Sequence, residues 1–245
     1  MSSWHSLLLL SSFVLLISCN NDVEFDMVYV EGGTFCMGTT DLDADPDEQN
    51  VRSVEVEDFY IGRYEVTQAE WVAVMKKNPS IFKNDRFPVE CVSWNDAQLF
   101  VKRLNEKTGR SFRLPTMEEW EYAAQGGKNG KIHRYAGSDT LANVGWNVDN
   151  SGETTHCVGS LRPNALGIFD MTGNVHEWCD NMFDSIYYIN DTLMSKEYDY
   201  SYVRVFKGGS WASYAKHCRL SNNNYNCVEF RNFTIGFRLA ENVAK

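Results

Sequence analysis

The residues best suited to chemistry lie in one stretch near the C-terminus, residues 204–240. This stretch holds a hydroxyl, an imidazole and a thiol within six positions, at Ser213, His217 and Cys218. A serine, a histidine and an acidic residue are the parts of a hydrolase, but no nucleophile-elbow pattern surrounds Ser213. A histidine next to a cysteine is by itself weak evidence for a metal site. The types and spacing therefore leave open whether this stretch reacts or only binds.

The middle of the same stretch is rich in Asn, Tyr, Phe and Cys and lies between two glycine-containing blocks, residues 208–211 and 235–238. Gly pairs and Asn runs favour neither helices nor central strands, so we expect an irregular surface loop that is held at both ends by buried residues. Rigid aromatic rings and adaptable amides are typical of binding loops. The predicted ligand-binding residues are Trp211, Ser213, Tyr214, His217, Asn222, Asn224, Tyr225, Asn226, Phe230, Asn232 and Phe233.

The elements that must position this loop are predicted from the rest of the chain. A strand over 27–30 is expected to form a hairpin with a second strand over 34–37, and alternation over 51–61 predicts a further strand. Capping boxes predict three helices, which begin at Thr67, Ser93 and Thr116. Beyond residue 126 regular patterning fades, and a long irregular stretch in a compact domain usually needs an ion, disulfides or a function to hold it.

Two acidic groups in these elements are interpreted as solvated. Residues 41–50 hold five acidic side chains and lack the spacing of a calcium-binding EF-hand loop, so we expect a solvated loop. Glu118, Glu119 and Glu121 lie in the first turns of a predicted helix, where the helix dipole favours negative charge. We expect all three to be surface charges rather than catalytic acids.

Composition limits the classes of function. The chain has 245 residues, of which 43% are hydrophobic and 13% aromatic, so one large domain can bury a sizeable core. Its net charge is −10, with 33 acidic and 23 basic residues. A nucleic-acid partner requires a basic surface, and anionic lipid repels an acidic protein. The charge therefore excludes nucleic acid and argues against electrostatic binding to a membrane.

The N-terminus predicts export. Residues 7–17 are almost entirely apolar, too few to span a bilayer and typical of a signal-peptide core. The following residues, 16–19 (LISC), resemble the lipobox of bacterial lipoproteins, which implies cleavage before Cys19, lipidation of Cys19 and anchoring in the cell envelope, at the outer membrane or the cell surface. The alternative is a secretory signal that is cleaved elsewhere. We therefore predict a signal peptide over 1–18, a tether over 19–26 and one domain over 27–245.

Six cysteines remain after Cys19, and an oxidising compartment permits disulfides among them. No pair has CxxC spacing, so a zinc site is not expected. We expect buried free thiols together with one or two bridges. The six are Cys36, Cys91, Cys157, Cys179, Cys218 and Cys227.

An ordered series of blocks across nearly the whole mature chain resembles the formylglycine-generating enzyme (sulfatase-modifying factor) family. The resemblance implies an α+β domain with the variant C-type-lectin fold and little regular secondary structure. In chain order the blocks are 32–38 (GGTFCMG), 64–67 (YEVT), 88–94 (PVECVSW), 113–121 (RLPTMEEWE), 164–167 (NALG), 173–178 (GNVHEW), 208–211 (GGSW) and 235–238 (IGFR).

The resemblance also bears on catalysis. Members of the family oxidise a sulfatase cysteine with oxygen and a Cu(I) ion, which is held by two thiols three and eight residues after a Gly-Gly-Ser. Counted from Ser210, these positions are Ser213 and Cys218, so the first thiol is missing. A serine hydroxyl is a poor ligand for soft Cu(I). We therefore expect no bound copper and no oxidase activity, with Ser213 and Cys218 as the former catalytic positions; the alternative is a remodelled centre that uses Cys218 alone or with Cys227.

The resemblance also implies a calcium site. Family members bind Ca²⁺ through a segment that corresponds to Asp170, Gly173, Val175 and Glu177 here. Two carboxylates and two backbone carbonyls are suitable oxygen ligands for Ca²⁺. In the alternative interpretation Glu177 caps a turn while Trp178 packs in the core. The family's second calcium site is not expected, because residues 143–157 are short and lack the matching side chains.

Together these observations predict a membrane-anchored, non-catalytic protein that binds a protein or glycan ligand through its C-terminal loop. The loop and its IGFR end also resemble the variable proteins of diversity-generating retroelements. Two alternatives remain: an oxidoreductase that converts a sulfatase cysteine to formylglycine at a remodelled centre, and a structural component of the cell envelope.

Overall fold

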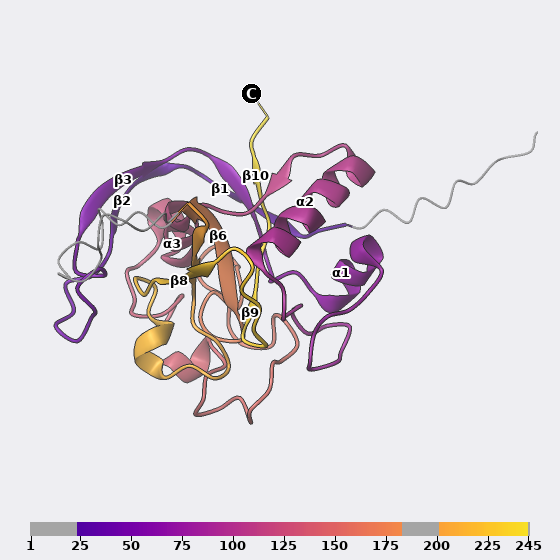
Figure 1. Cartoon of the computed structure of the whole chain (residues 1–245). Coiled ribbons are helices and arrows are strands. Elements are labelled where there is room, and N and C mark those ends of the chain that lie inside the picture. The colour runs from indigo at the N-terminus through magenta and orange to yellow at the C-terminus, as the bar shows by residue number, and fades with distance from the viewer. Residues whose placement is uncertain (1–23, 183–200, 245) are drawn as a thin grey trace, which may run out of the picture.

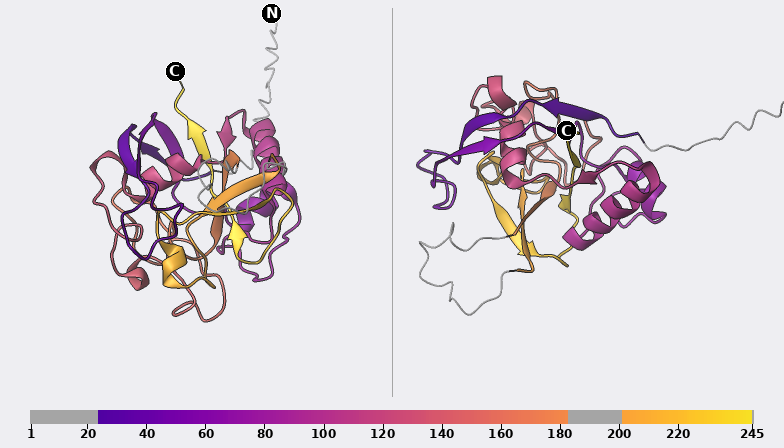
Figure 2. Two further views of the ribbon diagram at one scale, coloured as in Figure 1. Left: turned by 60° about the vertical axis from the view of Figure 1, so that its left-hand side comes forward. Right: turned by 90° about the horizontal axis from the view of Figure 1, so that it is seen from above.

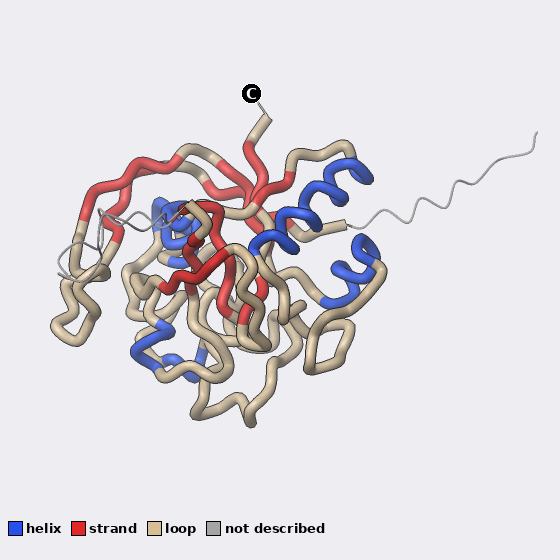
Figure 3. The backbone as a smooth tube through the Cα atoms, viewed as in Figure 1, coloured by secondary structure: helices blue, strands red, loops and turns tan. Residues whose placement is uncertain are grey.

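The computed structural model describes residues 24–182 and 201–244 (Figure 1). The predicted signal peptide and the predicted lipidation site Cys19 lie outside these residues. In the described part of the chain no helix is both long and apolar enough to cross a membrane. Loops make up much of the chain, and the few helices and strands lie among them (Figure 3).

Three small sheets form the framework. The first has the order β1-β4-β10-β5, the second pairs β2 with β3, and the third has the order β8-β7-β6-β9. In chain order the strands are β1 (Met27–Val30), β2 (Gly33–Met37), β3 (Arg52–Val56), β4 (Phe59–Gly62), β5 (Phe112–Arg113), β6 (His176–Met182), β7 (Val203–Lys207), β8 (Asn224–Cys227), β9 (Ile235–Gly236) and β10 (Ala240–Asn242). The second sheet extends as an arm to one side, opposite the first two helices (Figure 1).

Within residues 24–182 and 201–244 the α-helices are α1 (Gln68–Met75), α2 (Trp94–Thr108) and α3 (Met117–Ala124). Each begins at its predicted capping box, where the side chain of Thr67, Ser93 or Thr116 accepts a hydrogen bond from the third residue of the helix. The three predicted helix starts are therefore confirmed. Three short 3-10 helices, η1 (Gly127–Asn129), η2 (Leu141–Asn143) and η3 (Ala215–Cys218), lie in the connecting loops.

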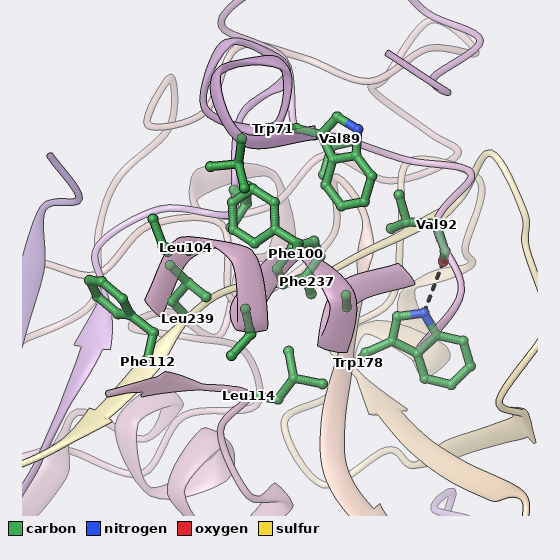
Figure 4. Close-up of a cluster of buried hydrophobic side chains, with 14 of the residues drawn as sticks. Trp71, Val89, Val92, Phe100, Leu104, Phe112, Leu114, Trp178, Phe237 and Leu239 are labelled. Carbon is green, nitrogen blue, oxygen red and sulfur yellow. Dashed lines mark hydrogen bonds between the residues drawn. The ribbon is translucent and has the colours of Figure 1, made fainter. Parts of the chain in front are cut away.

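The buried side of helix α2 packs in a hydrophobic cluster with α1 and with residues of the first and third sheets. Phe100 and Leu104 are fully buried, and Phe100 stacks on Trp71 of α1 at 5.3 Å and meets Phe237 edge to face at 5.4 Å (Figure 4). The indole of Trp178 donates a hydrogen bond of 3.0 Å to the carbonyl of Val92, just before α2 (Figure 4). Burial of each such ring stabilises the fold by about 1.5–3 kcal/mol. The core therefore joins the α1–α2 pair to the strands that carry the C-terminal stretch.

Two strand predictions are wrong. The strands over 27–30 and 34–37 do not form a hairpin, because β1 pairs with β4 while β2 pairs with β3. The single strand predicted over 51–61 is broken into β3 and β4, which lie in different sheets. Gly32, between β1 and β2, lies close to the end of β3, where a Cβ would lie 2.5 Å from the carbonyl oxygen of Val56. Because glycine has no Cβ, the link between β1 and β2 can pack against the link between β3 and β4 at this point. The Asp58 carboxylate accepts a 2.7 Å hydrogen bond from the Gly32 amide.

The tether is also shorter than predicted. Phe25 meets the rings of Phe100 and Phe112 edge to face at 6.2 and 5.6 Å. Asp26 forms an ion pair of 2.7 Å with Arg63. The folded domain therefore begins at Phe25 or earlier, rather than at residue 27.

Candidate functional site

The C-terminal stretch is more regular than predicted. Residues 224–227 form strand β8 at the edge of the third sheet, antiparallel to β7, with Tyr225 opposite Val205. The Asn-rich run was expected to form an irregular loop. An edge strand pairs with only one other strand, so it tolerates polar side chains that a central strand would exclude.

A buried ion pair between Arg219 and Glu48 attaches the C-terminal stretch to the loop over residues 41–50. Arg219 donates hydrogen bonds of 3.1 and 2.6 Å to the two carboxylate oxygens of Glu48, which also accepts bonds from Ser221 at 2.6 Å and Asn222 at 3.1 Å. Glu48 is 1% exposed, so the prediction that residues 41–50 form a solvated loop is wrong at this position. Asn222 is 3% exposed, which argues against its predicted role as a ligand contact.

A second buried cation lies beside the first pair. The ammonium of Lys207 on β7 contacts Glu121 at 3.1 Å, the carbonyl of Asn222 at 3.3 Å and the side-chain oxygen of Asn223 at 2.7 Å. Lys207 is 0% and Glu121 1% exposed. The prediction of a surface charge is therefore wrong for Glu121, which ties α3 to the C-terminal stretch.

The other predicted amide ligands also make internal hydrogen bonds. Asn224 donates to the side chain of Asn222 at 2.9 Å, and Asn226 accepts from the amide of Cys227 at 2.9 Å. Asn232 accepts from both the amide and the hydroxyl of Thr234 at 3.0 Å. These asparagines therefore shape the backbone in addition to any contact that they make with a ligand.

Several aromatic side chains of the stretch are exposed. Tyr214 is 67% exposed, Phe233 43% and Tyr225 41%. Trp211 lies between Phe82, at 5.4 Å, and Phe233, at 5.7 Å, and donates a hydrogen bond of 3.2 Å to the carbonyl of Phe233. We call Trp211, Tyr214, Tyr225 and Phe233, together with Phe82, the recognition face. Phe82 comes from the loop after α1, and no local sequence pattern pointed to it.

Phe230 belongs to the core rather than to this face, because it is partly buried against the hydrophobic cluster around α2. His217 is half-buried on η3, and its amide donates to the carbonyl of Tyr214 at 2.9 Å. Both residues were predicted ligand contacts. The structure gives Phe230 a packing role and leaves the role of His217 a prediction.

The two positions at which the resemblance implies copper ligands meet at Ser210. The hydroxyl of Ser213 accepts a hydrogen bond of 3.0 Å from the Ser210 amide and lies 3.0 Å from the Ser210 hydroxyl. Its third neighbour is Nε2 of His176, at 3.4 Å. Burial lowers the pKa of His176 to about 4, so this imidazole is neutral at physiological pH. The imidazole beside Ser213 is thus His176 and not His217, which removes the basis for a Ser213–His217 hydrolase pair.

Cys218 lies beneath the same turn and is fully buried. Gly209 covers it so closely that a Cβ there would lie 2.6 Å from the sulfur. Burial raises the pKa of the Cys218 thiol to about 12. Its sulfur is therefore protonated at neutral pH, whereas metal binding and nucleophilic attack both require the thiolate. All six cysteines of the described chain are free thiols, so the prediction of one or two bridges is wrong.

This environment predicts selective alkylation. Iodoacetamide at pH 8 should modify the exposed Cys36 in the native protein and leave Cys218 unmodified until the chain unfolds, because the population of the Cys218 thiolate rises only as the pH approaches 12. Peptide mass mapping after native and denaturing labelling measures both residues. Native labelling of Cys218 at the rate of Cys36 would contradict the buried site.

One of the predicted calcium ligands, Glu177, is paired with a buried arginine. Both oxygens of Glu177 accept hydrogen bonds of 2.6 Å from Arg238, and one also accepts a bond of 2.6 Å from the indole of Trp120. Asp170 and Glu65 are the neighbouring carboxyls, and all four charged groups are at least 97% buried. Burial raises the pKa of Asp170 to about 6, and burial together with the nearby Asp170 and Glu177 charges raises that of Glu65 well above its usual value.

These residues fit a calcium ion in part. Oδ1 of Asp170 is buried without a hydrogen-bond partner, as expected of an oxygen atom that coordinates a cation. Glu177, in contrast, is occupied by Arg238 and would have to share its oxygens. Among the described residues no group of three or more His, Cys, Asp or Glu side chains is arranged around a metal position. The site at Asp170, Gly173, Val175 and Glu177 therefore stays a prediction.

Calcium removal tests it. If the ion binds, millimolar calcium should raise the melting temperature above that in EGTA, because a ligand of the native state stabilises that state. The Asp170→Asn variant should lose most of this difference, since it lacks the buried carboxylate that has no other partner. A wild-type melting temperature that is equal in calcium and EGTA would contradict the site.

Comparison with known proteins gives a consistent result. The sulfatase-modifying factor enzyme 1-like domain matches residues 18–243. The chain is 31% identical to the chaperone protein LppX of Paenibacillus barcinonensis, over 90% of this chain and 92% of that protein. It is 33% identical to the formylglycine-generating enzyme of Streptomyces coelicolor, over 71% of this chain and 59% of the enzyme.

Solved structures agree with these matches. Treponema denticola variable protein 1 superposes with a TM-score of 0.79 at 30% identity, covering 91% of this chain and 97% of that one. PvdO from Pseudomonas aeruginosa superposes with a TM-score of 0.74 at 28% identity, covering 89% and 94%. The predicted fold, an α+β domain of the formylglycine-generating-enzyme type with the variant C-type-lectin fold, is confirmed.

Proposed function

Because the chain belongs to the sulfatase-modifying factor enzyme 1-like family, we propose that it uses the family fold as a non-catalytic binding protein of the cell envelope. Its ligand, a protein or a glycan, contacts the recognition face. The observation that carries this proposal is the state of the former copper positions. Ser213 supplies a hydroxyl that is already bonded to Ser210, and Cys218 supplies a buried, protonated thiol. These two residues do not fit Cu(I), which requires soft, accessible thiolates.

The recognition face has the properties of a binding surface. Tyr and Trp rings present large contact areas and lose little conformational entropy on binding. The buried Glu48–Arg219 and Lys207–Glu121 pairs fix the backbone that carries these rings. Little additional ordering of the protein is therefore needed when a ligand binds. A rigid, aromatic surface of this kind favours recognition over chemistry.

Two relatives support a binding role without defining the ligand. LppX is named a chaperone protein, and the Treponema denticola protein is named a variable protein. If this chain is diversified as well, the exposed positions of the recognition face, such as Tyr214 and Phe233, are the ones that can vary without cost to the fold. Asn222 and Asn232, with their internal bonds, are not. A near-copy of the codons for this stretch beside a reverse transcriptase gene would indicate diversification.

Anchoring at Cys19 completes the proposal. The lipobox-like residues 16–19 support lipidation, which would place the domain on the outer membrane or the cell surface. Radiolabelled palmitate should be incorporated into the wild-type chain and not into Cys19→Ser. Equal labelling of the two chains would refute the anchor.

The binding proposal is tested with two matched pairs of substitutions. Envelope proteins and glycan arrays are probed with the wild type, with Tyr214→Ala/Phe233→Ala, and with Leu42→Ala/Ile132→Ala as the control. The control removes side chains that are 99% and 77% exposed and lie outside the recognition face. We expect the first variant to lose about tenfold or more in affinity, as for interface hot spots, and the control to bind like the wild type. Equal binding by all three would refute the assignment of this face.

A further inference from the structure

The charge of the protein is unevenly distributed. The segments 68–77 and 94–110, which contain α1 and α2, hold six basic and three acidic residues, although the whole chain has a net charge of −10. Two of the acidic residues, Glu70 and Asp96, belong to capping boxes at the start of the helices. The third, Glu106, is exposed on α2, so six basic residues and one acidic residue lie outside the capping boxes of the two helices. The basic residues are Lys76, Lys77, Lys102, Arg103, Lys107 and Arg110.

These six side chains are all exposed and form one surface. Lys102, Arg103 and Lys107 follow one another along the solvent side of α2. The guanidinium of Arg103 reaches the sulfur of Met75 at 3.5 Å, so the basic side of α2 is continuous with Lys76 and Lys77 at the end of α1. We call this surface the basic face.

Most of its charge is not neutralised by the protein itself. Arg110 is paired with Glu241, while the other five basic residues form no ion pair with any described residue. Two apolar side chains lie on the same helices and are partly exposed, Val72 at 37% and Leu99 at 40%. Cationic heads with apolar side chains between them are typical of protein surfaces that rest on an anionic bilayer.

The position of the basic face relative to the N-terminus supports such a contact. The described chain begins between α1 and α2 (Figure 1), where Phe25 packs on Phe100 of α2. Five residues separate Cys19 from Phe25, and a chain of this length spans at most about 20 Å. A lipid on Cys19 would therefore hold the helices close to the membrane surface.

We propose that the basic face docks on the anionic headgroups of a bilayer, next to the lipid anchor. This inference rests on the proposed envelope location and adds the orientation of the domain. The 3-10 helix η3, which follows Tyr214, lies on the opposite side of the domain from α1 (Figures 1 and 2). Docking through α1 and α2 thus turns this part of the recognition face away from the bilayer. The net negative charge of the chain does not prevent the contact, because basic residues outnumber acidic ones by six to three in the segments that contain α1 and α2.

Vesicle sedimentation tests the proposal with the full mature chain carrying Cys19→Ser, so that no lipid contributes to binding. Vesicles of phosphatidylcholine are compared with vesicles that also contain phosphatidylglycerol, at low and high salt. Each basic residue near an anionic surface favours binding, and several together should raise the partition coefficient at least about tenfold on the phosphatidylglycerol vesicles. The increase should vanish at high salt, because salt screens exposed charges.

A charge-matched pair of variants identifies the face. Lys102→Glu/Arg103→Glu/Lys107→Glu should lose the increase on phosphatidylglycerol. The control, Lys131→Glu/Arg162→Glu/Lys216→Glu, has the same net charge, replaces three exposed residues outside α1 and α2, and should retain the increase. Equal partitioning of the parent chain onto both kinds of vesicle would overturn the proposal. Equal loss in both variants, or binding to soluble heparin without binding to the vesicles, would do the same. Failure here leaves the palmitate result unchanged, so the two proposals fail separately.

Discussion

Replacing Glu177 with alanine is expected to lower the free energy of unfolding by about 3–5 kcal/mol, the usual cost of leaving one partner of a buried ion pair alone. Arg238, which is 0% exposed, would keep its charge without the two 2.6 Å bonds that now neutralise it. Its remaining bonds, to the carbonyls of Gly62 and Phe169, do not replace a counter-ion. Urea unfolding at neutral pH measures the loss.

A control and a double variant isolate the ion pair. Glu55→Ala removes an exposed carboxylate from β3 and should change stability by less than about 0.5 kcal/mol. If Glu177→Ala does not fold, the comparison is made with Glu177→Met/Arg238→Met, which should be more stable than either single change because neither partner of this ion pair is left alone. A Glu177→Ala protein as stable as Glu55→Ala would show that Glu177 is not the counter-ion of Arg238.

Glu48→Ala should have a comparable effect, again about 3–5 kcal/mol, with a local consequence at the C-terminal stretch. It leaves Arg219 with only the 3.7 Å contact to Asp43 as an ion pair and removes the acceptor for Ser221 and Asn222. Hydrogen exchange of residues 219–227 should therefore accelerate more than that of α2. Asp45→Ala, an exposed change in the same loop, should leave both stability and exchange near the wild-type values.

The Glu48 effect should depend on pH with a defined sign. Burial raises the pKa of Glu48, but hydrogen bonds from Arg219, Ser221 and Asn222 outweigh it and hold the pKa below its usual value. A carboxyl whose pKa is lowered by folding contributes its stability above its unfolded pKa of about 4.3 and loses it as the pH falls through the folded value. The difference between wild type and Glu48→Ala should thus be full at pH 7 and shrink below about pH 4. A difference that grows in acid would contradict the pairing.

The sequence predicted those parts of the structure that depend on local signals. Capping boxes located the starts of three helices, because a hydroxyl and a carboxylate three residues apart satisfy amides within one turn. The ordered blocks of the family indicated the fold, although strands as short as β5 and β9 carry too few residues for any pattern of their own.

Contacts between distant segments could not be predicted in this way. Glu48 and Arg219 are 171 positions apart, and each resembles an ordinary surface charge when its own neighbours alone are considered. The same holds for His176, whose proximity to Ser213 depends on the turn that joins β7 to η3. Net charge likewise conceals the basic face, because it sums over the whole chain and hides the local excess of six basic over three acidic residues in the segments that contain α1 and α2.

The central claim, that the fold binds rather than oxidises, is tested most directly by one mass-spectrometric measurement. The purified mature chain is incubated with Cu(I), oxygen and a Cys-x-Pro-x-Arg peptide, and the peptide is then weighed. With a hydroxyl at Ser213 and a buried thiol at Cys218, we expect the peptide to keep its cysteine and the protein to retain no copper after gel filtration. Formation of the aldehyde peptide, together with copper bound at one ion per chain, would contradict the account.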